Sequence, residues 1–397
     1  MDFKPSKTPA DFISQYIQLI QKMKKAGFNT IIFQVRPMND AFYPSKYNPY
    51  SRYLTGKEGA GFAIASFDPL KFMISEAHRQ GMEFHAWFNP YRVHNGVNMS
   101  KERYLATLDR NNFAAKNPDC VLSLPQQNGT NMLLLDPGNP KVKLFLCNTI
   151  REVVEKYHVD AIHLDDYFYP YSGIGSADTA SFLKYGAKNY RSIDEWRRNN
   201  VNALIRNLHV LIRQNNQKQK KSIRFGISPF GIWANSPDPN SRKKKNDKAG
   251  MPPVKSHLYG SLSSGSQSYF DQYADSRRWI REGWIDYIVP QLYWSFDHEK
   301  APYAALADWW ADQVRGTKVE LYIGHSVYKL GSSEKAWQYP SELANQLKYN
   351  MMLPEIKGSF FFSARHIFPG ENAAQQQGCR QVVEHLWKKQ LPSSSQK

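Results

Sequence analysis

The sequence predicts an α/β fold, a (β/α)8 TIM barrel with long βα-loop insertions, and three observations support that class. Eight short apolar runs of strand-like composition recur along the 397 residues. Segments with helical spacing of apolar side chains lie between most of these runs, and such alternation indicates βαβ units and a parallel sheet. The first run ends in VRPMND rather than in a glycine-rich phosphate turn, which makes an open dinucleotide-binding sheet the weaker alternative.

The predicted strands are runs rich in β-branched, aromatic and other apolar residues. In chain order they cover 30–37, 82–93, 131–138, 159–170, 223–233, 285–294, 320–330 and 358–368. Side chains of a barrel strand point alternately to the axis and to the helices, so the helix-facing positions should be apolar. This alternation predicts which polar residues face the barrel interior.

Three predicted helices, 9–26, 69–80 and 140–157, begin with a capping side chain followed by proline at the first helical position. Gly27 and Gly81 then end two of them, because glycine accepts the left-handed conformation of a helix end. The remaining predicted helices, identified by helical spacing of apolar residues, are 192–214, 269–282, 301–315, 340–350 and 371–389.

We expect one domain, 1–390, followed by a flexible tail, 391–397, because no Pro/Gly/Ser-rich linker marks a domain boundary. Two long insertions, 38–67 and 234–268, follow the first and fifth predicted strands. Both therefore fall on the face where barrel active sites are built. The second insertion carries a lysine run, 243–245, which is either a solvated loop or a grip for an anionic ligand.

The charge balance is strongly basic, with 52 Lys and Arg against 35 Asp and Glu and a net charge of +17. Such a field attracts anionic partners. No nucleic-acid recognition motif accompanies the charge, so we expect no nucleic-acid partner. The three cysteines are far apart, and no HxH or HExxH spacing occurs. We therefore expect no disulfide framework, no metal and no other cofactor.

Membrane and export signals are absent from the printed sequence in their usual forms. No apolar stretch approaches the roughly 18 residues that span a bilayer. The first residues, MDFKPSKTPADF, contain no apolar signal-peptide core. We expect either a cytoplasmic chain or a mature form whose leader has been removed.

Two adjacent acids, Asp165 and Asp166, follow an apolar run in HLDDYFYP. If Ile162 and Leu164 face the helices, then His163 and Asp165 point toward the barrel axis and Asp166 begins the loop. An ionised carboxylate at the inner carboxyl end of a strand is costly unless it has partners or a role. We therefore take Asp165 as the first catalytic candidate and Asp166 as a close second.

The same alternation places further polar and aromatic side chains at this face of the barrel. They are Gln34, Arg36, His85, Trp87, Asn89, Asp136, Ser228, Gln291, Tyr293, Ser363 and Arg365. In the seventh predicted strand, the alternation leaves open whether His325 or its neighbours Gly324 and Ser326 face inward.

This set has the chemistry of a carbohydrate site. Amides and charged groups bond to hydroxyls, and aromatic faces cover the C–H faces of sugars. A glycosidic bond is broken by two carboxyl groups, roughly 5–5.5 Å apart in retaining and 6.5–9.5 Å apart in inverting enzymes. Besides the two acids, we expect substrate contacts from Arg36, His85, Trp87, Asn89, Asp136, His163, Tyr167, Gln291, Tyr293 and Trp294.

Some of these residues also have purely structural explanations. His85 and His163 could be hydrogen-bonded core histidines. Asp136, in LDPGNP, could cap the turn into the next helix. The aromatic rings of YFYPY could pack inside the protein, although their place on a loop at the barrel mouth favours contact with a ligand.

Several long motifs in a consistent order resemble a known family. They are QVRPMNDAFYPS (34–45), HAWFNPYRV (85–93), LDPGNP (135–140), HLDDYFYP (163–170), SPFGIW (228–233), REGWIDYIVPQLYW (281–294) and LYIGH (321–325). Together they resemble the glycosyl-hydrolase-like family 10, which includes a divisome-localised peptidoglycan glycosidase of Gram-negative bacteria. The resemblance covers nearly the whole chain.

The resemblance implies a (β/α)8 barrel and a glycoside hydrolase that acts on glycan, with peptidoglycan strands stripped of their stem peptides as the expected substrate. It also implies export, either to the periplasm or as an outer-membrane or cell-surface lipoprotein whose lipid-anchored leader has been trimmed. The family motif DGI(H/Q)xDDYFYP falls on 160–170, with Ala161 where glycine is usual.

The resemblance also implies roles for single residues. Asp165 matches the place where many barrel glycosidases keep a nucleophile or principal carboxylate, and Arg36, Asn89 and Tyr293 match positions that would line the sugar subsite. The second catalytic carboxylate stays open. Its candidates are Asp136, Asp166 and Asp297. The residues therefore do not decide between retention and inversion.

Two other functions compete with a glycosidase. A catalytically inactive glycan-binding barrel is favoured by the lack of an obvious acid/base Glu at a strand end. A metal-dependent barrel hydrolase or deacetylase would use His85, His163 and Asp165, although no metal-ligand spacing supports it.

Overall fold

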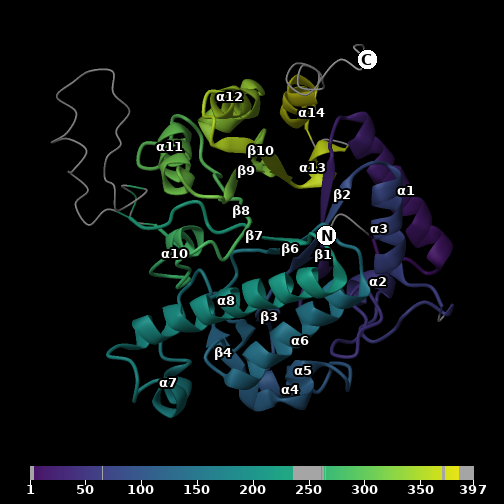
Figure 1. The fold of residues 1–397 in the computed structure, drawn as a ribbon, viewed down its shortest axis with the longest axis vertical. Helices are drawn as coiled ribbons and strands as arrows, with labels where there is room; N and C mark the ends of the chain where they lie inside the picture. The colour runs from purple at the N-terminus through teal and green to yellow at the C-terminus, as the bar shows by residue number, and fades with distance from the viewer. Residues whose placement is uncertain are drawn as a thin grey trace.

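The computed structural model describes residues 4–64, 66–235, 261, 263, 265–368 and 372–383. Its centre is a curled sheet of seven parallel strands, with helices packed around the outside (Figure 1). In hydrogen-bonded order the strands are β1 (Thr30–Arg36), β2 (Glu83–Phe88), β6 (Ala161–Leu164), β7 (Arg224–Ile227), β8 (Tyr287–Ile288), β9 (Glu320–Ser326) and β10 (Ile356–Phe362). The fold is therefore an α/β barrel of the TIM type, as predicted.

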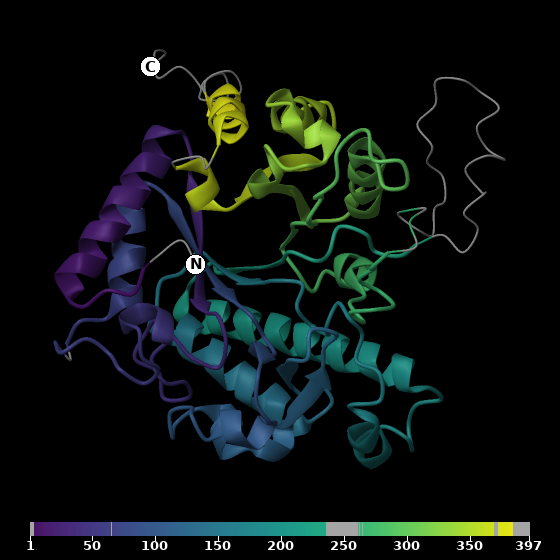
Figure 2. The same ribbon diagram turned by 180° about the vertical axis from the view of Figure 1, so that it is seen from behind.

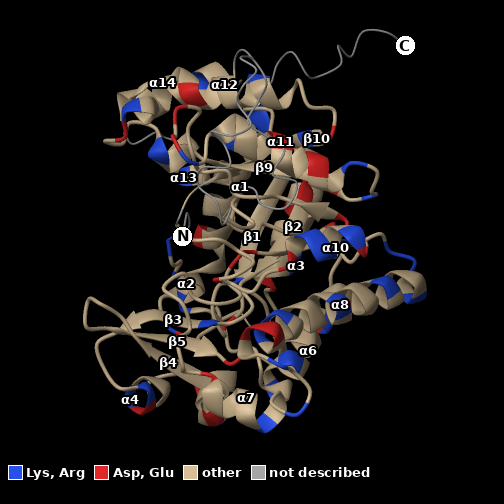
Figure 3. Cartoon of the chain, turned by 90° about the vertical axis from the view of Figure 1, so that its left-hand side faces the viewer, with Lys and Arg blue, Asp and Glu red and all other residues tan. Residues whose placement is uncertain are grey.

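One predicted barrel strand lies elsewhere. The run 131–138 forms β5 (Asn131–Leu135), which pairs antiparallel with β3 (Arg92–Val97) and β4 (Val121–Pro125) in a separate three-stranded sheet (Figure 3). Among the described strands, β2 pairs directly with β6. A short buried apolar run has the same composition in either kind of sheet, so composition alone could not separate the two placements.

The principal helices begin within two residues of the predicted starts, except α10, which begins seven residues later. They are α1 (Pro9–Lys25), α3 (Pro69–Arg79), α6 (Pro140–Lys156), α8 (Ile193–Gln219), α10 (Ser276–Arg281), α11 (Tyr303–Val314), α12 (Ser341–Asn350) and α14 (Ala373–Gln381). Shorter helices are α2 (Arg52–Thr55), α4 (Lys101–Leu105), α5 (Phe113–Lys116), α7 (Thr179–Tyr185), α13 (Ala364–Ile367) and the 3₁₀ turns η1 (Pro118–Cys120), η2 (Val327–Lys329) and η3 (Lys335–Gln338).

Capping explains why the first helices begin where the sequence predicts. At α1, Thr8 accepts from the Asp11 backbone N–H, and Asp11 accepts in return from that of Thr8. Gly27 and Gly81 have φ of 90° and 66°, the left-handed region that favours glycine. The predicted segment 269–282 is helical only over α10, and α8 runs five residues beyond its predicted end at 214.

The two edges of the sheet face each other across a seam. The hydrogen-bonded order starts at β1 and ends at β10, and both ribbon views place the yellow C-terminal elements beside the purple first helix (Figures 1 and 2). Phe28, just before β1, packs edge-on against Phe361 of β10 at 5.7 Å between ring centroids. Aromatic side chains therefore bridge the described edge strands.

The predicted domain, 1–390, and the predicted tail, 391–397, are only partly covered by the described residues. The predicted insertion 38–67 is described apart from residue 65, whereas most of 234–268, including the lysine run, and all of 391–397 lie outside the described residues. Among the described helices, none is long and apolar enough to cross a bilayer.

Candidate active site

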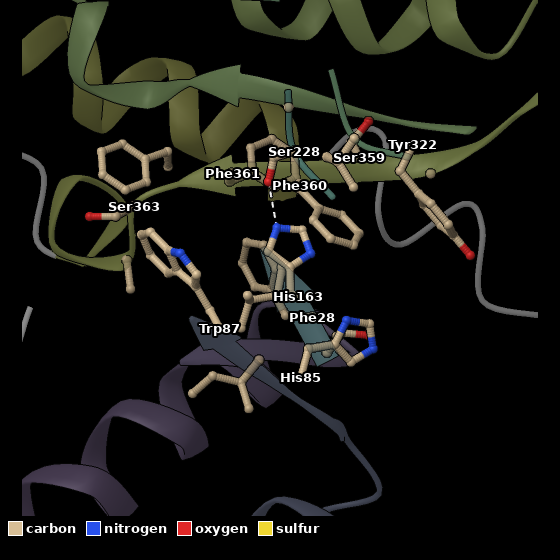
Figure 4. A pocket seen from close by; sticks show the side chains of 18 of the residues that line it. Phe28, His85, Trp87, His163, Ser228, Tyr322, Ser359, Phe360, Phe361 and Ser363 are labelled. Carbon is tan, nitrogen blue, oxygen red and sulfur yellow. Dashed lines mark hydrogen bonds between the residues drawn. The ribbon is translucent and has the colours of Figure 1, made fainter. Parts of the chain in front are cut away.

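The site lies inside the curled sheet. A cavity of about 1530 Å³ runs along its inner face from the amino ends of the strands, at Glu83 and Asp160, to their carboxyl ends, at Asp165 and Asp166. Figure 4 shows Trp87, His85 and His163 among the side chains that line it. Because barrel active sites occupy the carboxyl-end face, the chemistry is expected at Asp165 and Asp166.

Asp165 is buried and held by three donors. Its Oδ2 accepts from Trp87 Nε1 at 3.0 Å and from Asn89 Nδ2 at 2.8 Å. Its Oδ1 accepts from the Tyr167 backbone N–H at 3.2 Å. The Asn89 amide is itself oriented, because its Oδ1 accepts from the Arg92 backbone N–H at 2.9 Å. The carboxylate of Asp165 is thus fixed in one position.

Asp166 is equally buried but has different partners. Tyr171 donates its hydroxyl to Oδ2 of Asp166, and Gln291 hydrogen-bonds the same side chain. Burial and, to a smaller degree, the neighbouring Asp165 charge raise the pKa of Asp166 to about 6, against the opposing effect of these hydrogen bonds. Burial also raises the pKa of Asp165, and the Arg92 charge and the three donors to Asp165 oppose that rise. Because these groups favour a charged Asp165 and that charge disfavours a second one, Asp166 is the better placed of the two to hold a proton.

A chain of hydrogen bonds continues from the site into the barrel. Ser228 contacts His163 Nε2 (Figure 4). Tyr287 bridges Nδ1 of His163 and Nδ1 of His85 at 3.0 Å each, and His85 Nε2 reaches Glu83 Oε2 at 3.0 Å. The carboxylate of Glu83 can only accept, so Nε2 of His85 carries the proton. Tyr287 then donates to His85 and accepts from His163, which in turn accepts from Ser228.

The histidines are therefore neutral members of a buried network. Burial and, to a smaller degree, the neighbouring His85 lower the pKa of His163 to about 3, and burial also lowers the pKa of His85. This fits the core alternative for both residues, although both also line the cavity. Among the described residues, no group of three His, Cys, Asp or Glu side chains is arranged to hold a metal ion.

The predicted alternation is confirmed at most strand ends. His85, Trp87, His163, Asp165, Gln291 and Tyr293 all line the cavity, as do Gln34, Ser228, Ser363 and Arg365. Asp166, which the alternation assigned to the start of the loop, lines the cavity as well. In β9 the open question is resolved: Gly324 lines the cavity, whereas His325 is buried beside Gln346 and Tyr303.

The prediction that Arg36 faces inward is wrong. The pairing of β1 with β2 shifts between Gln34 and Arg36, so that Gln34 pairs with Trp87 but Arg36 pairs with Phe88. Such a bulge turns the next side chain to the other face of the sheet. Arg36 is fully buried there, and it donates to the Asn89 carbonyl oxygen at 2.5 Å. Arg36 therefore holds the backbone of Asn89, which in turn bonds to Asp165, and does not reach the cavity.

Four other predicted contact residues also lie outside the cavity lining, namely Asn89, Asp136, Tyr167 and Trp294. Asn89 holds Asp165 instead. Asp136 accepts from the Gly138 N–H at 2.8 Å and from the Ser181 hydroxyl, which is the turn role left open above. The Tyr167 ring lies under the Arg92 guanidinium at 4.7 Å, and Trp294 packs edge-on against Phe230.

The structure also places residues that the strand pattern did not single out. Arg92 lines the cavity next to Asp165, Tyr171 bonds Asp166, and Tyr287 joins the two histidines. Arg92 is the first residue of β3, in the separate antiparallel sheet, and Tyr171 lies in the loop after β6, so alternation along the barrel strands placed neither of them at the cavity. Of the candidates for a second carboxylate, Asp166 lines the cavity, and neither Asp136 nor Asp297 does.

A parallel α/β barrel with a buried carboxyl pair among amides and aromatic rings at its carboxyl-end face has the architecture of a barrel glycoside hydrolase. Residues 10–340 match the family described as Glycosyl hydrolase-like 10, and the chain belongs to that family.

Relatives and solved structures agree with this class. The chain is 41% identical over 357 residues to glycosyl hydrolase YngK of Bacillus subtilis, covering 89% of this chain but 63% of that protein, so it spans less than two thirds of this relative. It is 36% identical over 382 residues to glycosyl hydrolase DigH of Escherichia coli K12, covering 94% and 79% of the two chains. The PgaB (BpsB) glycoside hydrolase domain of Bordetella bronchiseptica shares the fold, with a TM-score of 0.53 at 11% identity over 97% of both chains.

Proposed function

We propose that the protein is a glycoside hydrolase in which Asp166 gives a proton to the leaving oxygen while Asp165 stays charged beside it. The observation that carries this proposal is the buried acid pair with unlike partners at the carboxyl ends of the strands. Two carboxyl groups whose environments push their pKa values apart are the usual sign of an acid and a charged partner in one active site. Membership of the glycosyl hydrolase-like family supports the same reaction class.

We propose a polysaccharide chain, rather than a small glycoside, as the substrate. An arc of aromatic rings lines the same cavity as the acids: the ring centroids of Trp87 and Phe362 lie 6.5 Å apart, those of Phe362 and Tyr328 6.3 Å, and those of Tyr328 and Tyr293 6.0 Å. Phe362 and Tyr328 are 45% and 40% exposed. Exposed rings can cover the C–H faces of sugars, and a run of several rings suits several consecutive sugars.

Among polysaccharides, we propose peptidoglycan strands stripped of their stem peptides. The motif resemblance to the family supports this choice. Loss of the peptide leaves a lactyl carboxylate on alternate sugars, and a net charge of +17 suits an anionic chain. Arg92 and Arg365 line the cavity, and Figure 3 shows further Lys and Arg on α8 and α10. This substrate places the enzyme outside the cytoplasm, which cell fractionation would test.

The decisive experiment is digestion of purified peptide-free glycan strands, with the products identified by mass. We expect the wild-type protein to release soluble fragments and Asp166→Asn to release almost none. Asp160→Asn is the matched control, because Asp160 lines the same cavity at the amino ends of the strands, away from the acid pair, and accepts from the Phe84 N–H. Tight binding of glycan without any product from the wild-type protein would instead establish an inactive glycan-binding barrel.

A further inference from the structure

Hydrogen bonds from the described residues leave Asp165 one free acceptor position. An ionised carboxylate offers about four lone-pair positions. Trp87 and Asn89 occupy both positions on Oδ2, and the Tyr167 N–H occupies one on Oδ1. Because Asp165 lines the cavity, the remaining position is available to a bound ligand. A carboxylate in this state is well suited to accept one N–H from that ligand.

The position of Asp166 also indicates where the nucleophile of the reaction comes from. Asp165 and Asp166 leave β6 as consecutive residues and line one cavity, so both carboxyl groups reach a bound sugar from the same strand end. A protein nucleophile and a general acid instead flank the scissile bond from two sides. The pair is therefore better arranged to serve one side of the sugar, where a leaving oxygen and a neighbouring ring substituent both lie.

We propose that the nucleophile is supplied by the substrate itself, as the carbonyl oxygen of a 2-acetamido group, and that Asp165 accepts the amide N–H of that group. This inference rests on the proposed glycosidase function and gives the 2-acetamido group of the substrate a direct part in the reaction. Trp87 and Asn89 are then positioning residues, which hold the Asp165 carboxylate where it can accept the N–H of the substrate's acetamido group.

The reaction balances within the substrate, the two acids and one water. The acetamido oxygen forms a bond to C1 as the C1–O glycosidic bond breaks, and Asp166 gives its proton to the departing oxygen. The resulting cyclic oxazolinium ion keeps its N–H on Asp165. Water then attacks C1, Asp166 takes a proton from it, and the ring opens to restore the acetamido group. The product retains the configuration at C1.

The test compares three forms of the same peptide-free glycan: native, chemically de-N-acetylated, and re-N-acetylated. We expect native and re-N-acetylated chains to be cleaved and the 2-amino chain to be cleaved at least about 100-fold more slowly, because the internal nucleophile is gone. Equal cleavage of all three forms would overturn this inference while leaving the glycosidase standing. Cleavage of none of them would instead remove the proposed function.

Two further measurements address a protein nucleophile directly. Incubation with a 2-deoxy-2-fluoro glycoside should leave the intact mass of the protein unchanged, and a covalent adduct on any carboxylate of the chain would overturn the inference. Added azide should not restore Asp165→Ala, whereas rescue with formation of an inverted glycosyl azide would identify Asp165 as the nucleophile. Circular dichroism should show a wild-type fold for Asp165→Ala, and Asp165→Asn serves as a second variant.

Discussion

Trp87 of β2 and Asp165, just beyond β6, are joined across neighbouring strands by a hydrogen bond of 3.0 Å from the indole Nε1 to the carboxylate Oδ2. The register explains this contact, because Trp87 pairs with His163 and Asp165 lies two residues further on the same inward side. Asn89, two residues beyond Trp87, reaches the same oxygen. Two adjacent strands thus fix the orientation of one acid.

Replacement of Asp166 by asparagine should remove most activity without unfolding the protein. An asparagine can accept from Tyr171 as the carboxyl does, but it cannot donate a proton to a leaving oxygen. We expect kcat/KM on glycan to fall by about 10²–10⁴-fold, the usual contribution of a general acid. Steady-state kinetics would check this, and near-wild-type rates would assign the proton to another group.

Activity should decline at alkaline pH because Asp166 must be protonated. With a pKa of about 6, the protonated fraction falls roughly tenfold for each pH unit above that value. The acidic limb belongs to Asp165, whose pKa is also raised by burial. A pH profile of kcat/KM would show the limbs, and the residual activity of Asp166→Asn should lack the alkaline one. An alkaline limb unchanged in that variant would contradict the assignment.

The Asp166 carboxyl group should lower the free energy of unfolding at neutral pH. The pKa of Asp166 rises from 3.8 to about 6 on folding, so the folded state holds its proton more tightly than the unfolded state. Stability therefore falls as pH rises between these two values, and the loss persists above them. A shift of about two units corresponds to roughly 3 kcal/mol. Asp166→Asn should then be more stable than wild type at pH 7, with little gain at acidic pH.

A buried acid away from the cavity provides the matched control for that measurement. Asp40, bonded by Ser51 at 2.7 Å, also has its pKa raised to about 6 by burial. Asp40→Asn should change the pH dependence of urea unfolding in the same direction, with activity unaffected. If only the Asp166 variant gained stability at pH 7, burial would not be the cause.

Loss of the Arg36 side chain should destabilise the protein rather than weaken substrate binding. Its guanidinium bonds to Asn89, Asn39 and Asn48, all away from the cavity. Arg36→Met leaves these buried acceptors without a donor, at a cost of about 2–4 kcal/mol. Urea unfolding would measure the loss, and KM should stay within about twofold at temperatures where the variant is folded. A large rise in KM at unchanged stability would instead support the original prediction that Arg36 contacts the sugar.

The hydroxyl of Tyr287 should matter for stability because it joins two buried histidines. Tyr287→Phe leaves Nδ1 of His163 and Nδ1 of His85 unpaired, at about 1–3 kcal/mol each. Gly226→Ala should perturb the same network, because a Cβ at Gly226 would collide with the Tyr287 ring. Thermal unfolding would test both variants. A Tm equal to that of wild type in Tyr287→Phe would show that water replaces the hydroxyl.

Local sequence rules predicted a large part of this fold. Capping pairs located the starts of α1, α3 and α6, since a cap depends on residues within one turn. Alternation along β6 placed His163 and Asp165 inside, since successive side chains of a strand must point to opposite faces. The motifs around Asp165 also indicated the family, which the comparison over 10–340 confirms.

Other features depended on how strands pair over long distances. The apolar run of β5 joined an antiparallel sheet rather than the barrel, although its composition fits either place. A one-residue shift between Gln34 and Arg36 turned Arg36 out of the cavity, and no local pattern marks such a shift. The partners of the acid pair likewise come from separate segments, with Trp87 and Asn89 on one side and Tyr171 on the other.

The sequence by itself therefore determined the barrel class, the inward position of Asp165 and the neighbouring acid, because periodicity and capping act between residues close in the chain. Only the tertiary structure decided the surroundings of each acid. Burial and charge at Asp165 and Asp166 depend on groups brought in from other strands and loops, and these surroundings raise the pKa of both acids, that of Asp166 to about 6.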